Sequence, residues 1–153
     1  MTYRDDKYPG VTFRIEAEQD NEQVRGNAMA SGDDTADKQA EDEILKRLDS
    51  GDVWAWATVR VIACYEAGEE TFEGDNYLGA CSYASEANFA QYGGYFDDMK
   101  GQAVCALALT MRAAEERGEA ARAGRQLLEQ AAGWLLFSLY GCITMKGFPL
   151  GSS

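Results

Sequence analysis

The sequence predicts an α+β fold, in which a small and mainly antiparallel sheet packs against helices over residues 1–150. Segments that alternate between apolar and polar residues, typical of half-buried strands, lie in the first half of the chain. Apolar residues recur at helical spacing in the last third. With 153 residues, of which 46% are hydrophobic, the chain is long enough to bury one core without cross-links. We expect one domain, followed by a loose tail at residues 151–153.

The first half of the chain predicts two strands and one helix. Residues 11–18 alternate strictly, which indicates a strand with an apolar inner face and a mostly acidic outer face. Asp33 or Asp34 caps a helix that runs to about Asp49, acidic at its start and basic in its last turn, as the helix dipole favours. Residues 53–66 form the strongest strand, with one face of small apolar residues suited to receive a helix. The inner stripe of the helix is expected to comprise Ala36, Ala40, Ile44, Leu45 and Leu48.

The second half predicts the partner strand and the remaining helices. About three strands are expected in total, and the third pairs antiparallel with residues 53–66 as a hairpin. Gly118 is expected to break or kink the helical pattern near the C-terminus, which divides it into two long helices. The predicted elements are an acidic loop at 67–76, a strand at 77–83, a helical turn at 85–89, and helices at 96–117 and 119–140.

The cysteines and the apolar segments bear on the location of the protein. Four widely spaced cysteines, with no export signal at the N-terminus, predict free and buried thiols in a reducing cytoplasm. The longest apolar run, residues 131–143, is shorter than the roughly 20 residues that a membrane span requires, so it indicates a buried helix. We therefore expect a cytoplasmic protein that makes no membrane contact. The cysteines are Cys64, Cys81, Cys105 and Cys142.

Charge is unevenly distributed along the chain. The formal net charge is −12, and residues 1–100 carry 22 acidic against 9 basic side chains, whereas residues 101–153 carry 4 against 5. Proteins that bind nucleic acid directly cluster Lys and Arg on one surface, so this distribution argues against such binding. An acidic surface instead attracts a basic protein partner and accelerates its association.

The residue types present exclude several kinds of catalytic site. Without histidine, the chain can form neither a Ser–His–Asp nor a Cys–His site, and it contains neither a phosphate-binding loop nor a dinucleotide-binding glycine motif. The acidic residues at 69–75 lack the spacing of an EF-hand, and the cysteines lack the close pairs of a zinc site. We expect a protein that is not an enzyme and holds no metal or cofactor. A carboxylate-dependent, metal-assisted hydrolase is the less favoured alternative.

Aromatic residues crowd into residues 54–96, and most of them are expected in the core. Several nevertheless stand beside acidic residues, and Tyr and Trp are residues that anchor protein interfaces. Exposed aromatic side chains rimmed by carboxylates suit a partner rich in Lys and Arg. The alternative is an ordinary solvated acidic hairpin together with acidic residues that stabilise a helix start. The predicted partner-binding residues are Glu69, Glu70, Glu73, Asp75, Tyr77, Tyr92, Tyr95, Asp97 and Asp98.

Three segments carry a resemblance to known proteins: DVWAWA at 52–57, DNYLGACSY at 75–83 and GGYFDDM at 93–99. They resemble small uncharacterised acidic proteins of bacteriophages and mobile elements, over roughly residues 25–105. That resemblance implies no particular functional residue. A small, acidic chain without catalytic motifs is also similar in general terms to anti-CRISPR and anti-restriction proteins, many of which act as DNA mimics.

The second likeness implies an inhibitor in the cytoplasm of a host cell. Such a protein blocks a basic partner that handles nucleic acid, such as a CRISPR effector or another nuclease, by filling its groove with carboxylates. The alternative function is that of a structural or accessory phage protein that assembles as a homo-oligomer. A homodimer would then form through an exposed face containing Trp54 and Trp56, or through the apolar C-terminal helix.

Overall fold

The computed structural model describes the backbone of residues 1–147 and nearly all side chains up to residue 129. The chain divides into two compact units, Met1–Met111 and Arg112–Ser153. All described residues of the second unit belong to one helix. The tail at 151–153, and the side chains of the apolar run 131–143, lie outside the described part of the chain.

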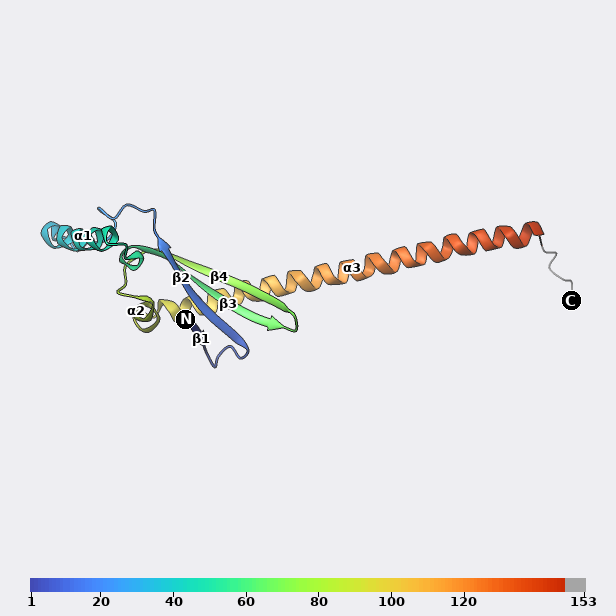
Figure 1. The fold of residues 1–153 in the computed structure, drawn as a ribbon, viewed down its shortest axis with the longest axis horizontal. Helices are drawn as coiled ribbons and strands as arrows, with labels where there is room; N and C mark the ends of the chain where they lie inside the picture. Colours follow the sequence, from blue (N-terminus) through green and yellow to red (C-terminus); the bar gives the residue numbers. More distant parts are fainter. Residues whose placement is uncertain (148–153) are drawn as a thin grey trace. The chain divides into compact units, whose positions relative to one another are not determined.

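The first unit contains a four-stranded antiparallel sheet, which confirms the α+β class (Figure 1). Its strands follow the order of the chain, β1-β2-β3-β4, and each pairs with its neighbour. The register places Phe13 opposite Ala63, and Ala63 opposite Gly74. The strands are β1 (Thr2–Arg4), β2 (Val11–Gln19), β3 (Ala57–Ala67) and β4 (Glu70–Cys81).

Four helical segments accompany the sheet. Asp33 is the N-cap of α1, where its side chain accepts hydrogen bonds from the backbone N–H groups of Thr35 and Ala36. Ser85 caps α2 in the same way, so both predicted helix starts are confirmed. The segments are α1 (Asp34–Asp49), the 3-10 turn η1 (Val53–Ala55), α2 (Glu86–Gln91) and α3 (Tyr95–Gly147).

The sheet differs from the sequence prediction in three places. Strand β1 was not expected, since three residues are too few to show an alternating pattern. The strand predicted at 53–66 begins only at Ala57, because the Asp52 side chain accepts a hydrogen bond from the Trp54 N–H and closes a helical turn. The segment predicted as an acidic loop is mostly strand, because β4 begins at Glu70 and only a two-residue turn separates it from β3.

The C-terminal part forms one helix, so the prediction of two helices divided at Gly118 was wrong. A glycine in a helix interior costs about 1 kcal/mol, and it ends a helix only when its backbone turns left-handed. Gly118 keeps a helical backbone among residues that favour helix. No helix in the described part of the chain has both the length and the apolar character needed to cross a membrane.

Two further expectations about burial need correction. Ala36 is exposed, and the buried residue of α1 is Glu41, which accepts hydrogen bonds from Arg25 and from the Gly26 N–H. Cys105 is exposed, because it lies on the side of α3 that faces away from the sheet. Cys64, Cys81 and Cys105 are free thiols, and the side chain of Cys142 lies outside the described part of the chain.

The core lies between one face of the sheet and the first four turns of α3. Gly74 allows this packing, since a Cβ there would lie only 2.6 Å from the backbone oxygen of Ala103 and still closer to the backbone nitrogen of Leu107. The helix therefore covers one face of the sheet and leaves the other without a helix over the middle of β2, β3 and β4 (Figure 1). The core residues are Phe13, Ile15, Ala57, Val59, Val61, Ala63, Phe89, Phe96, Met99, Ala103 and Leu107.

Candidate functional site

The sheet face opposite α3 is the candidate site, and we refer to it as the open face. Side chains alternate between the two faces of a strand, so every second residue of β2, β3 and β4 lies on it. Three of the predicted partner-binding residues, Glu73, Asp75 and Tyr77, are brought together there on β4. The open face is formed by Thr12, Arg14, Glu16, Arg60, Ile62, Cys64, Glu66, Glu73, Asp75 and Tyr77.

Two arginines bind the acidic residues in the middle of the open face. Arg60, on β3, donates from Nε and Nη2 to the Asp75 carboxylate at 2.8 and 2.6 Å, and from Nη1 to Glu16 at 3.2 Å. Arg14, on β2, donates to Glu73 at 3.1 Å. The hydrogen bond to Asp75 raises the pKa of Arg60 above its usual value. The two arginines therefore neutralise the carboxylates that they bind and join three neighbouring strands.

Tyr77 stands beside this network as an exposed aromatic ring. The Arg60 guanidinium carbon lies 5.7 Å from the centre of the Tyr77 ring, within the range of a cation–π contact. The side chain of Tyr77 is 56% exposed. Its neighbour Arg60 is held by hydrogen bonds to the carboxylates of Asp75 and Glu16. Exposed Tyr side chains are among the residues that most often anchor protein interfaces.

The Cys64 thiol lies on the same face but is not activated for chemistry. Its sulfur accepts a hydrogen bond from Arg14 Nη1 at 3.2 Å and lies 3.6 Å from a Glu73 carboxylate oxygen. Burial raises the pKa of Cys64, and Glu73 adds to this effect while Arg14 opposes it. The protonated thiol is therefore the form present near neutral pH, and thiols in that form are poor nucleophiles.

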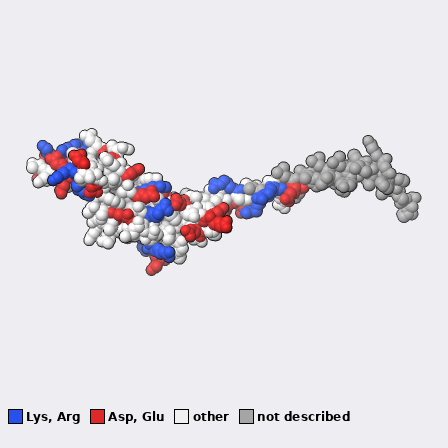
Figure 2. All heavy atoms as spheres, in the orientation of Figure 1, with Lys and Arg blue, Asp and Glu red and all other residues white. Residues whose placement is uncertain are grey.

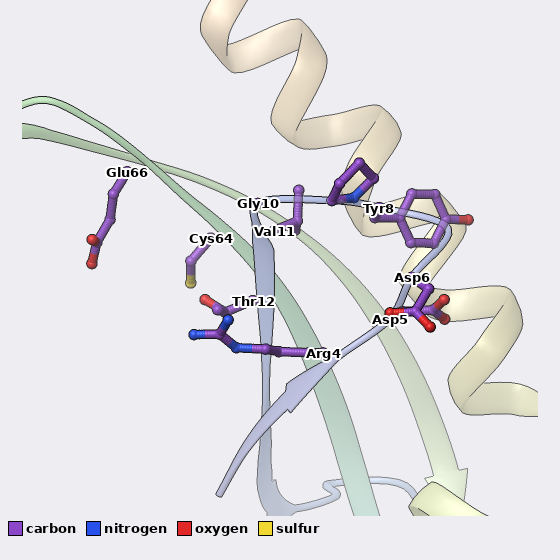
Figure 3. Close-up of a pocket in the computed structure, with 10 residues that line it drawn as sticks. Arg4, Asp5, Asp6, Tyr8, Gly10, Val11, Thr12, Cys64 and Glu66 are labelled. Atoms are coloured by element: carbon purple, nitrogen blue, oxygen red, sulfur yellow. The ribbon is translucent and has the colours of Figure 1, made fainter.

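A hollow of about 360 Å³ lies where the β1–β2 loop meets β3. Figure 3 shows Arg4, Thr12 and Cys64 directed toward the same side of the strands, with Glu66 further along β3. Its lining carries one cation, Arg4, and three carboxylates, so the hollow is acidic on balance. Its remaining lining residues are Asp5, Asp6, Tyr8, Pro9, Gly10 and Val11.

The end of the β3–β4 hairpin carries the acidic residues that remain unneutralised. Glu66, Glu69 and Glu70 are exposed, and within the described residues none of them has a Lys or Arg nitrogen within 4.0 Å. Figure 2 shows acidic atoms gathered around this hairpin end. The structure thus divides the predicted acidic cluster: Glu73 and Asp75 are paired within the sheet, whereas Glu69 and Glu70 form no ion pair among the described residues.

The other predicted residues lie at the junction of α2 and α3, away from the hairpin. Tyr92 and Tyr95 are 62% and 51% exposed, and Asp97 forms an ion pair of 2.8 Å with Lys100. Since β4 meets α3 at Leu107, Asp97 lies about 15 Å further along the helix axis at 1.5 Å per residue. The predicted partner-binding residues therefore form two separate surfaces, one on the β3–β4 hairpin and one at the α2–α3 junction. Asp98 is exposed at the start of α3.

Most of the other aromatic residues belong to the core, as expected. Phe89 is fully buried, with its ring 5.0 Å from that of Tyr83 and 6.1 Å from that of Phe96. Trp56 is only 3% exposed, because its Nε1 donates to the Glu22 carbonyl under the chain that leads to α1. This burial corrects the expectation of an exposed face containing Trp54 and Trp56, since Trp54 is also half-buried.

The sequence prediction of the binding site missed four residues: Arg14, Glu16, Arg60 and Glu66. The alternating pattern of the strands could have identified them, since each occupies a polar position that this pattern places on the solvent face. In the described part of the chain, no three His, Cys, Asp or Glu side chains are arranged to hold a metal ion.

Comparisons with known proteins gave no match. No protein-family model matches the sequence, no curated protein matches it, and no solved structure matches its fold. Function is therefore inferred from the geometry and charge of the chain itself.

Proposed function

We propose that this protein is a non-catalytic binding protein whose acidic first unit binds a basic protein partner. The observation that carries the proposal is the group of exposed and unpaired carboxylates Glu66, Glu69 and Glu70 at the end of the β3–β4 hairpin. Unpaired surface carboxylates retain their full charge, so they attract Lys and Arg side chains over a distance of about 10 Å at moderate salt.

The distribution of charge between the two units supports this proposal. Residues 101–111 carry no charge, so the unit Met1–Met111 holds 22 acidic and 9 basic residues, a balance of −13. The unit Arg112–Ser153 has a balance of +1. The negative field thus belongs to the unit that contains the sheet, and such a field increases the association rate of a basic partner.

The partner class follows from the same charges. We favour a basic protein that handles nucleic acid, such as a CRISPR effector or another nuclease, because its groove is lined with Lys and Arg that normally contact phosphates. Carboxylates on the hairpin end would occupy those contacts and block the groove. The protein would then be an inhibitor of the kind that phages and mobile elements encode.

Capture from a host extract tests this function. Three forms are compared at low and at high salt: the wild type, a hairpin variant with Glu69→Gln and Glu70→Gln, and a control with Glu43→Gln and Asp49→Asn. The control removes two exposed charges of the same sign from α1. The expected result is a basic protein captured at low salt by the wild type and the control but not by the hairpin variant. If the same protein is captured equally at low and high salt, and equally by the hairpin variant and the wild type, the proposal is overturned.

A second candidate function, assembly through α3, has an observation of its own. After Met111 the helix continues to Gly147 as the sole element among the described residues of its unit. Isolated helices are marginally stable in water, and residues 130–145 contain no charged side chain. A second copy of the chain would provide an apolar surface for this stretch to pack against, as expected for an accessory protein that forms homo-oligomers.

A further inference from the structure

We propose that β4 is a docking edge that accepts an extended basic segment of the partner as a fifth strand. The inference rests on the proposed function, because it specifies how the acidic unit would hold its basic partner. Its starting point is the strand order β1-β2-β3-β4, in which β4 pairs with β3 alone.

The main chain of β4 offers hydrogen bonds along its free side. In an antiparallel ladder, every second residue of an edge strand directs its N–H and C=O groups away from its neighbour. β4 extends over 12 residues, and in the described part of the chain no other strand pairs with its outer side. β1, at the opposite edge, has only 3 residues and leaves little backbone to pair with. A partner strand therefore finds its longest template at β4.

The charge of β4 selects the occupant. The strand contains Glu70, Glu73 and Asp75 and no basic residue. A second copy carries the same net charge of −13 in its sheet unit, which disfavours self-pairing. A basic segment instead places its cations near Glu70 and near Glu69 in the adjoining turn, neither of which has a Lys or Arg nitrogen within 4.0 Å among the described residues.

The two faces of β4 define the side chains that the segment should carry. On the open face, Glu66 at the hairpin end is unpaired within the described residues and Tyr77 is 56% exposed, whereas Glu73 and Asp75 are already bound by Arg14 and Arg60. On the face toward α3, Phe72 and Leu78 are half-buried and offer apolar surface. The matching partner is an extended segment in which basic residues alternate with β-branched apolar residues.

The far end of β4 limits how far the partner can extend. Ala80 has a left-handed backbone, with φ of 52°, and its N–H donates to the Asp20 carboxylate at 2.7 Å. The Ala80 N–H is therefore not available to a partner, and the backbone there departs from a regular strand. The partner segment would pair with β4 from Glu70 to Leu78 only.

The test uses a capped peptide, Lys-Val-Lys-Val-Lys-Val-Lys, and two N-methylated forms of it. One form is methylated at the valine nitrogens and the other at the inner lysine nitrogens. Alternate N–H groups of an extended peptide point to opposite sides, so each form loses the N–H donors on one side of the peptide only. Strand addition predicts that one form binds about tenfold or more weakly than the parent, since several hydrogen bonds are lost together, while the other form binds like the parent. Equal affinities of the two methylated forms overturn the docking edge.

A protein variant supplies a matched control for the same titration. Thr71 is exposed on β4, so Thr71→Lys adds a like charge beside the peptide and Thr71→Val adds none. We expect Thr71→Lys to weaken binding of the parent peptide roughly two- to fivefold and Thr71→Val to leave it unchanged. If binding depends on salt but the two methylated forms bind equally, docking at the β4 edge is rejected while the proposed binding of a basic partner stands. If the peptide does not bind even at low salt, both the docking edge and the proposed function are rejected.

Discussion

Gly74 is the residue at which the sheet and α3 come into direct contact. Its missing side chain lets the helix backbone at Ala103 and Leu107 lie against β4, and Gly74 itself is buried. Alignment of the open face therefore depends on a position that contributes no side chain to it. The glycine is required here for space and not for backbone conformation, since its φ is not positive.

Gly74→Ala is expected to destabilise the protein by at least about 2 kcal/mol, because the new methyl group overlaps helix backbone that cannot move aside. Thermal unfolding followed by circular dichroism measures the change. Gly124→Ala is the control, since nothing lies within 4 Å of its Cβ position and the substitution favours helix by about 1 kcal/mol. An unchanged melting temperature for Gly74→Ala would show that the close approach does not exist.

Asp20 fixes the end of β4 through three hydrogen bonds. Its carboxylate accepts from the Thr58 hydroxyl and from the N–H groups of Glu22 and Ala80, each at 2.7 Å. The hydrogen bond from Thr58 and those from the two backbone groups lower the pKa of Asp20. The ionised form is therefore preferred in the folded protein.

The lowered pKa gives a definite pH dependence. A carboxyl group whose folded pKa lies below the unfolded value stabilises the fold fully above about 3.9, and this contribution disappears as pH falls through the folded pKa. Asp20→Asn is expected to lower the melting temperature at pH 6, and the difference from wild type should shrink as the solution is acidified. A difference that stays constant or grows in acid would contradict this role, and Glu22→Gln serves as the control.

At the scale of elements, the sequence prediction succeeded where the signal is local. Strict alternation predicted β2, and a capping side chain predicted the start of α1. The helical turn expected at 85–89 is α2. It placed the second half of β4 correctly but failed for the first half, because Glu70, Glu73 and Asp75 are typical of a loop when their cross-strand arginines are unknown. It also failed for α3, where Gly118 was given more weight than the helix-favouring residues around it.

The candidate site was predicted in part for the same reason. Tyr77, Glu73 and Asp75 alternate along one strand, so a correct strand assignment places them on one face. The separation of Tyr92 and Tyr95 from the hairpin depends on how α3 crosses the sheet. That crossing is determined by the close approach at Gly74, which no local pattern reveals.

Lys100 joins α3 to the β1–β2 loop and allows a test of that junction. It is 7% exposed and forms ion pairs with Asp5 and Asp97. Burial lowers the pKa of Lys100, but the hydrogen bonds to the two carboxylates outweigh this effect and raise it. Lys100→Met leaves the Asp5 carboxylate without its cation, so we expect a larger loss in the free energy of unfolding than for removal of the exposed Asp97 charge.

The matched control for Lys100→Met is Asp97→Asn. Asp97 is mostly exposed, so its removal should cost about 0.5 kcal/mol or less. Urea unfolding measures both variants. Equal losses would mean that the pair with Asp5 contributes nothing beyond the surface pair with Asp97.

At the scale of the whole molecule, charge and apolar residues belong to different units. The unit Met1–Met111 carries the acidic excess and the sheet, whereas the uncharged stretch 130–145 belongs to the second unit. Binding of a basic partner and assembly of copies would therefore use different parts of the chain. We therefore expect substitutions that impair one proposed function to leave the other unchanged.

Assembly through α3 predicts that the full chain is an oligomer in solution. Light scattering on the wild type should give a mass above 16.8 kDa that rises with concentration. A variant with Leu135→Lys and Leu139→Lys should shift to the mass of one chain, because charge is introduced into the uncharged stretch. Leu109→Lys, at an exposed position of the first unit, is the control. A wild type that remains monomeric at high concentration would rule out assembly.

The most direct test of the central claim is the salt dependence of binding to a lysine-rich peptide, measured by calorimetric titration. Electrostatic binding through the hairpin end predicts an affinity that falls steeply with added salt in the wild type. It also predicts little remaining binding when Glu69→Gln and Glu70→Gln are combined, whereas the α1 control retains the wild-type affinity. An affinity that is insensitive to salt, or equal in the two variants, would contradict the proposal that this acidic surface binds a basic partner.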